Sequence, residues 1–169
     1  MSESETKVPY FHYYIDKVTD ESVVEALKTS MNEQIDFLGS IPLEKADYAY
    51  AEGKWTIKQL VQHMIDTERI FLYRALTFIR EENATVPGYD HDMYGDNSNL
   101  DHVEYPKLVG ELMTVRLSTV TFFENLRVED LKCSGSANDI QMTVDDIGRI
   151  IVGHVLHHND VIKERYLAS

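Results

Sequence analysis

The stretch that decides the fold is residues 55–71, WTIKQLVQHMIDTERIF. Thr56 and Gln59 have the spacing of a capping box, in which two side chains hydrogen-bond each other's backbone at a helix start. Apolar residues then recur every three or four positions, which is the period of one buried helix face. We expect a helix over 56–82, whose buried stripe comprises Ile57, Val61, Met64, Glu68, Phe71, Ala75 and Phe78, with His63 on the adjoining ridge.

Three further segments show the same period. They cover 20–38, 104–126 and 143–167, and the last opens with Thr143 and Asp146 at capping-box spacing. Residues 84–103 lack the period and are rich in Pro, Gly, Asn and Asp, so they form a long connection between the second and third helices. The sequence therefore predicts a single all-α domain over 1–169, a four-helix bundle, with 1–8 flexible. The first helix is expected to bury Val24, Leu27, Met31, Ile35 and Leu38.

Composition excludes several classes of partner. The chain of 169 residues has 16 basic and 29 acidic side chains and a formal charge of −13, which repels nucleic acid and anionic membranes. It shows neither an apolar targeting segment nor a run long enough to span a bilayer. The lone Cys133 cannot form an internal disulfide. We therefore expect a cytoplasmic protein with a small-molecule substrate, and neither nucleic acid nor membrane as a partner.

The histidines carry the functional signal. His154 and His158 lie one turn apart in the predicted buried stripe of the last helix. Imidazoles four residues apart on one helix face can converge on a single ion, and His63 from the second helix would supply a third nitrogen. The alternative interpretation is three core histidines satisfied by ordinary hydrogen bonds. Spacing excludes a zincin protease and a carboxylate-bridged di-iron bundle, so a mononuclear site of three histidines remains.

Three other residues are second-tier candidates for catalysis. Glu68 interrupts an apolar stripe and either reaches the metal site or pairs with Arg74 or Arg116. Asp66 either faces solvent or orients the His63 ring, and His157 points about 100° away from His158, toward an outer or entrance position. The remaining histidines, His12, His91 and His102, are expected to be solvated.

These motifs resemble the DinB/YfiT-like superfamily of metalloenzymes. The resemblance lies in residues 55–69, in Gly153-His154-Val-Leu-His157-His158 about ninety residues later, and in the loops 87–90 and 134–138. It implies a four-helix bundle with a divalent metal on His63, His154 and His158, pairing of many members as homodimers, and, in some relatives, S-transfer or isomerisation with a low-molecular-weight thiol. One departure is that residues 159–161 are Asn-Asp-Val, where an Arg-Gly-Gln often follows the last two histidines in the family.

Three hypotheses follow for function. The first is an enzyme, a thiol-dependent S-transferase or a hydrolase, in which the metal prepares a nucleophile and Tyr89, His91 and Tyr94 shape the substrate entrance. Zinc suits three imidazoles best, and nickel, iron and manganese are alternatives. The second is a non-catalytic dimeric metal-binding bundle, which full coordination by Glu68 would favour. The third is a metal-free bundle with an apolar ligand pocket.

Overall fold

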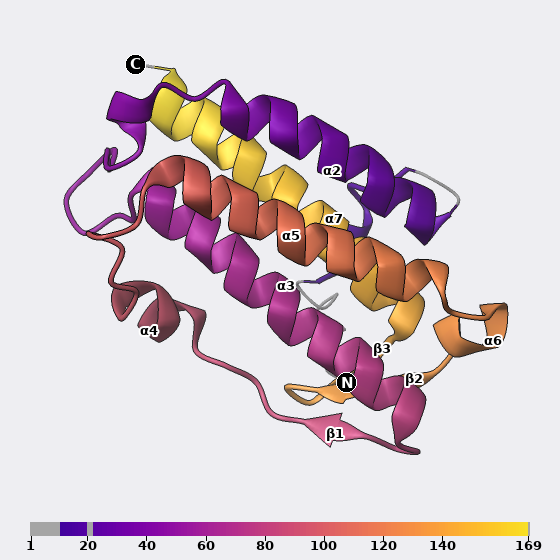
Figure 1. Cartoon of the computed structure of the whole chain (residues 1–169). Coiled ribbons are helices and arrows are strands. Elements are labelled where there is room, and N and C mark those ends of the chain that lie inside the picture. Colours follow the sequence, from indigo (N-terminus) through magenta and orange to yellow (C-terminus); the bar gives the residue numbers. More distant parts are fainter. Residues whose placement is uncertain (1–10, 20–21, 169) are drawn as a thin grey trace, which may run out of the picture.

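The computed structural model describes residues 11–19 and 22–168, so the expected flexible segment 1–8 lies outside the described residues. Four long helices form the bundle: α2 (Val23–Gly39), α3 (Ile57–Arg80), α5 (Tyr105–Glu124) and α7 (Val144–Val161), the last continued by the π-helix η2 (Ile162–Leu167) (Figure 1). Each long helix packs against two others, α2 and α3 both contacting α5 and α7. The four-helix bundle expected from the stripes is therefore present.

The predicted helix starts have the expected caps. In α3, the Gln59 backbone N–H donates to Thr56 Oγ1 at 3.2 Å, and the Thr56 N–H donates to Gln59 Oε1 at 2.9 Å. Thr143 and Asp146 form the same reciprocal pair at the start of α7, at 3.0 and 2.8 Å. Each box satisfies two backbone donors that a helix start leaves unpaired.

The buried face of α2 differs from the predicted one. Ile35 is 43% exposed, and Val24 and Met31 are only partly buried, whereas Ser30 and Gln34 are buried instead. The prediction placed only apolar residues inside. Ser30 and Gln34 are buried without large cost because each has a polar partner on another helix, Arg116 and Asn159 respectively.

The connections between the long helices contain more structure than expected. A three-stranded sheet is formed by β1 (Thr85–Val86), β2 (Ser134–Ala137) and β3 (Ile140–Thr143), with β1 parallel and β3 antiparallel to the central β2. Four short helical segments complete the described elements: α1 (His12–Ile15), η1 (Leu43–Lys45), α4 (His91–Asp96) and α6 (Val128–Leu131). The expectation that 84–103 is irregular throughout is thus wrong at β1 and α4, which are too short to show a period in sequence.

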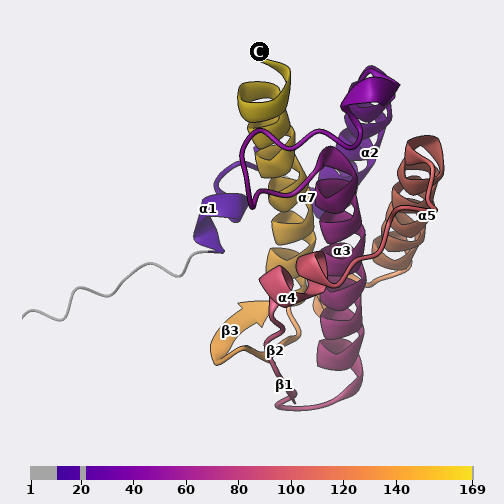
Figure 2. The ribbon, with the colours of Figure 1, turned by 90° about the vertical axis from the view of Figure 1, so that its left-hand side faces the viewer.

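The short elements lie around α3 and α7 (Figure 2). Helix α1 packs on α7 and α4 packs on α3. At Gly95 of α4, an added Cβ would lie 2.2 Å from the Trp55 ring, so only glycine allows this close approach. The indole Nε1 of Trp55 also donates to Asp96 at 3.3 Å, which holds α4 beside the start of α3.

A polar layer divides the core into two hydrophobic clusters. One cluster contains the first half of α2 and the sheet residues, and the other contains the beginnings of α3 and α5. Between them lie buried polar side chains from all four long helices: Ser30, Gln34, Glu68, Arg116 and Asn159. Within the described residues, no helix is both long and apolar enough to cross a bilayer.

Candidate metal centre

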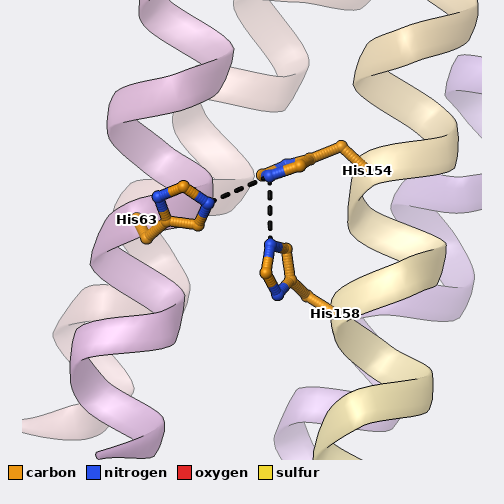
Figure 3. A group of neighbouring side chains, drawn as sticks. All are labelled: His63, His154 and His158. Carbon is orange, nitrogen blue, oxygen red and sulfur yellow. Dashed lines mark hydrogen bonds between the residues drawn. The ribbon is translucent and has the colours of Figure 1, made fainter. Parts of the chain in front are cut away.

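The three predicted histidines meet inside the bundle. His63 projects from α3, and His154 and His158 project from successive turns of α7 (Figure 3). Nε2 of His154 lies 3.0 Å from Nε2 of His63 and 3.0 Å from Nε2 of His158. The helix geometry explains the arrangement, because residues four apart on α7 face the same neighbour, and that neighbour is α3.

Burial keeps these imidazoles neutral. His63 and His154 are only 8% and 6% exposed, and His158 is partly buried. Burial, with a smaller effect from His91, lowers the pKa of His63 to about 4. Burial followed by the neighbouring histidines lowers the pKa of both His154 and His158 well below the ordinary value. Neutral imidazole has the free lone pair that binds a metal ion.

The donor set fits a divalent ion. Within the described residues, these three histidines form a group whose ligand atoms all lie within 4.8 Å of one another, and no carboxylate or thiolate belongs to it. Nitrogens bound tetrahedrally to zinc at about 2.1 Å would lie about 3.4 Å apart, close to the two distances found here. Three neutral rings with converging Nε2 atoms thus form three-quarters of a tetrahedral site.

The second ring nitrogen of His158, Nδ1, is buried and lacks a protein partner among the described residues. Metal-binding histidines usually donate their second ring N–H to a carboxylate or carbonyl, which fixes the orientation of the ring. His158 therefore depends on packing and on contacts at Nε2 for its position.

The second-tier candidates have different surroundings. Glu68 is 2% exposed and forms a bidentate ion pair with Arg116, at 2.8 and 2.9 Å, so it belongs to the polar layer and not to the histidine group. Asp66 accepts a hydrogen bond from Gln62 Nε2 at 2.9 Å and lines a separate, shallower pocket. Glu68 thus has the paired role that the sequence left open, and Asp66 does not orient His63.

The histidines line a cavity of about 700 Å³. His157 is also among the lining residues, with Nδ1 3.3 Å from the Tyr13 hydroxyl, and its role at an entrance stays a prediction. Tyr89 and the exposed His91 also line the cavity, as expected for an entrance, whereas Tyr94 lines the neighbouring shallow pocket. His91 is solvated as predicted, yet its ring centroid is 5.9 Å from that of His63.

Sequence reasoning missed several residues of this cavity. Part of its lining comes from segments outside the four long helices, among them α1, residues 50–55 before α3, the start of α4 with the residues before it, and the β2–β3 turn. On α3, Thr67 and Arg74 follow His63 by four and eleven residues, a spacing that puts them on the same helix face. That spacing was visible in the sequence. Two cavity residues, Phe11 just before α1 and Tyr14 within it, follow no helical repeat that would have marked them.

The chain belongs to the DinB superfamily, because the profile of that family matches residues 26–162. A protein of Oceanobacillus iheyensis named "Putative metal-dependent hydrolase" is 33% identical over 82 residues, 47% of each chain. A Bacillus cereus protein of the same name is 23% identical over 120 residues, 68% of each chain. The match thus spans about half the length of the first of these relatives.

A solved structure shares the fold. Bacillus subtilis YfiT, described as a probable metal-dependent hydrolase with an unusual four-helix bundle topology, superposes with a TM-score of 0.73 at 18% sequence identity. The match covers 91% of this chain and 86% of YfiT. The likeness confirms the bundle predicted from the helix stripes.

Proposed function

We propose that the protein is a metal-dependent enzyme in which His63, His154 and His158 hold one divalent ion at the end of the cavity. The observation that carries this proposal is the convergence of three neutral Nε2 atoms without a further protein ligand among the described residues. Structural zinc sites are closed by four protein ligands, whereas catalytic sites keep a position open. Glu68, the residue that the sequence suggested could close the site, is instead paired with Arg116.

The three histidines line a cavity whose volume suits a small molecule. When bound, the ion supplies a Lewis acid that lowers the pKa of a water molecule or thiol at the open position. The chain itself supplies the orientation: His63 is held against the ring of Trp55, at a centroid distance of 5.2 Å, and His154 against that of Tyr14, at 5.4 Å. These aromatic walls keep bulk water away from the histidines.

The names of the relatives favour hydrolysis, and the family resemblance adds transfer of a low-molecular-weight thiol as an alternative nucleophilic reaction. Both reactions place the nucleophile at the same open position. Zinc is the metal that suits three imidazoles best, with nickel, iron and manganese accepted by the same donors. A panel of esters and amides, run with and without thiols and electrophiles, separates water from thiol as the nucleophile.

Metal analysis tests the proposal directly. Protein purified without a histidine tag and loaded with zinc should retain about one equivalent, and His158→Ala should retain less than about a tenth. His102→Ala is the matched control, because His102 is exposed and outside the histidine group. Retention of zinc by the His158 variant, or its absence from the unaltered chain after loading, would contradict the proposed centre.

A further inference from the structure

Arg74 lies on the same face of α3 as the candidate metal centre. It follows His63 by eleven residues, which is about three helical turns with only about 20° of rotation. Both side chains line the 700 Å³ cavity. Their backbone positions are separated by about 16 Å along the helix, and the long arginine side chain leans back toward the helix start. A molecule touching both groups therefore spans on the order of 10 Å.

The Arg74 guanidinium is buried without an anionic partner in the described part of the chain. The residue is 6% exposed, its Nη2 donates to the carbonyl of Pro87 at 3.4 Å, and its guanidinium stacks over the Phe71 ring at 4.9 Å. None of the ion pairs among the described residues includes it. Buried charges are normally paired, because their loss of hydration must be compensated.

Arg116, a buried arginine with a structural role, has hydrogen-bond partners that Arg74 lacks. Its guanidinium makes two bonds to Glu68 and a third to Ser30, at 2.6 Å. Arg74 has only one long bond to a neutral carbonyl and faces the cavity. Most of its donors are therefore available to a ligand that enters the cavity.

Tyr89 follows Pro87, the residue whose carbonyl accepts from Arg74, by two positions, and it lines the same cavity. Tyr89 and Thr67 share a hydrogen bond of 2.6 Å, and both line the cavity. Burial raises the pKa of Tyr89, so its hydroxyl stays protonated and can donate. Burial lowers the pKa of Arg74, with an opposing effect from Tyr89, and an incoming anion would relieve that cost.

We propose that Arg74 and the Tyr89 hydroxyl bind a carboxylate of the substrate, while the reacting group of the same molecule lies at His63, His154 and His158. The inference rests on the proposed function and names its substrate class: an elongated molecule with a carboxylate at one end. A planar guanidinium matches a carboxylate through two parallel hydrogen bonds and balances its single charge. A residue acting this way determines specificity and leaves the metal untouched.

Binding of mercaptoalkanoates to the zinc-loaded full chain tests this assignment by calorimetry. The thiol is a probe for the metal and the carboxylate a probe for Arg74. Mercaptooctanoate has the length that reaches both groups, and mercaptopropionate is too short. We expect mercaptooctanoate to bind roughly 10- to 100-fold more tightly than mercaptooctanamide, which is the difference expected for a buried charge-assisted hydrogen bond. Mercaptopropionate should show no such preference over its own amide.

Three variants locate the preference. Arg74→Gln should remove the preference for the acid while the affinity for the amide stays unchanged, and Arg74→Lys should retain part of that preference. Lys54→Gln is the control and should retain all of the preference, because Lys54 is the other permanent cation on the cavity wall but is exposed. Zinc content and circular dichroism establish that each variant is folded and loaded.

Equal binding of mercaptooctanoate and mercaptooctanamide to the unaltered chain would overturn the carboxylate site. A preference for the acid that persists in Arg74→Gln would overturn it as well. Tight binding of the amide in either case would leave the metal centre intact. A chain that holds no zinc after loading would overturn the proposed function and the Arg74 site together, and metal analysis detects that outcome independently.

Discussion

At the residue scale, two arginines that the sequence presents as equivalent partners for Glu68 have different surroundings. Helical spacing indicated that Glu68 faces inward, but it did not show which helix provides its counter-ion, because that depends on how α5 is rotated against α3. The structure pairs Glu68 with Arg116 and leaves Arg74 facing the cavity. For His63, His154 and His158, by contrast, spacing put all three in or beside predicted buried stripes, and the family resemblance, not spacing alone, implied that they share one metal ion.

The Glu68–Arg116 pair gives a stability prediction. Glu68→Gln leaves the Arg116 charge buried beside a neutral amide and should lower the free energy of unfolding by about 3–5 kcal/mol. Arg69→Gln, which breaks the exposed pair with Glu111, should cost only about 0–1 kcal/mol. Urea denaturation measures both. The folded Glu68 variant should still bind one equivalent of zinc, and loss of zinc there would assign Glu68 to the metal centre.

The histidines give a pH prediction for the metal-free protein. A histidine whose pKa is 6.5 when unfolded and about 4 when folded, as for His63, binds fewer protons in the folded state. Its contribution is fully present above pH 6.5 and is lost as the pH falls toward 4, so stability decreases in that direction. Urea midpoints measured from pH 7.5 to about 5.5 avoid most carboxylate titration. His63→Gln should make the decrease in stability with falling pH smaller. An unchanged dependence of the urea midpoint on pH would contradict the role given to His63.

At the element scale, long amphipathic helices were predictable and short elements were not. Capping boxes at Thr56 and Thr143 located two helix starts to the residue. The two-residue strand β1 and the four-residue helix α1 contain too few residues for a period to be recognised. The buried face of α2 was predicted correctly at Leu27 and Leu38 but not at Ser30 and Gln34, because hydrophobicity alone cannot foresee polar partners across the bundle.

The docking of α1 on α7 depends on Gly153. A Cβ added there would lie 1.9 Å from the carbonyl oxygen of Tyr14, which leaves no room for any side chain. Gly153→Ala should therefore displace α1 and lower stability by roughly 1–3 kcal/mol, as overpacking does. Gly110→Ala on α5 meets nothing within 4 Å and should instead stabilise by up to about 1 kcal/mol. Thermal unfolding compares the two; a neutral Gly153 variant would contradict the tight contact.

At the scale of the whole molecule, the metal should stabilise the fold without being needed for it. The two hydrophobic clusters already span the bundle, so the metal-free chain should fold. A ligand that binds only the folded state raises the free energy of unfolding by about 4 kcal/mol when its free concentration is a thousand times its dissociation constant. Zinc should therefore raise the melting temperature of the chain, and His154→Ala should abolish the rise.

The homodimer and the cytoplasmic location stay predictions, for which sedimentation and cell fractionation are the measurements.

The origin of the cavity lining has a consequence for how the specificity of this chain could be changed. The three histidines lie on α3 and α7, whereas much of the remaining cavity lining comes from α1, residues 50–55, the region around the start of α4, and the turn joining β2 to β3. Insertions or replacements in those peripheral segments alter which molecule is accepted without repacking the four long helices. The four-helix scaffold of this chain can in this way be given new substrates through its connecting segments alone.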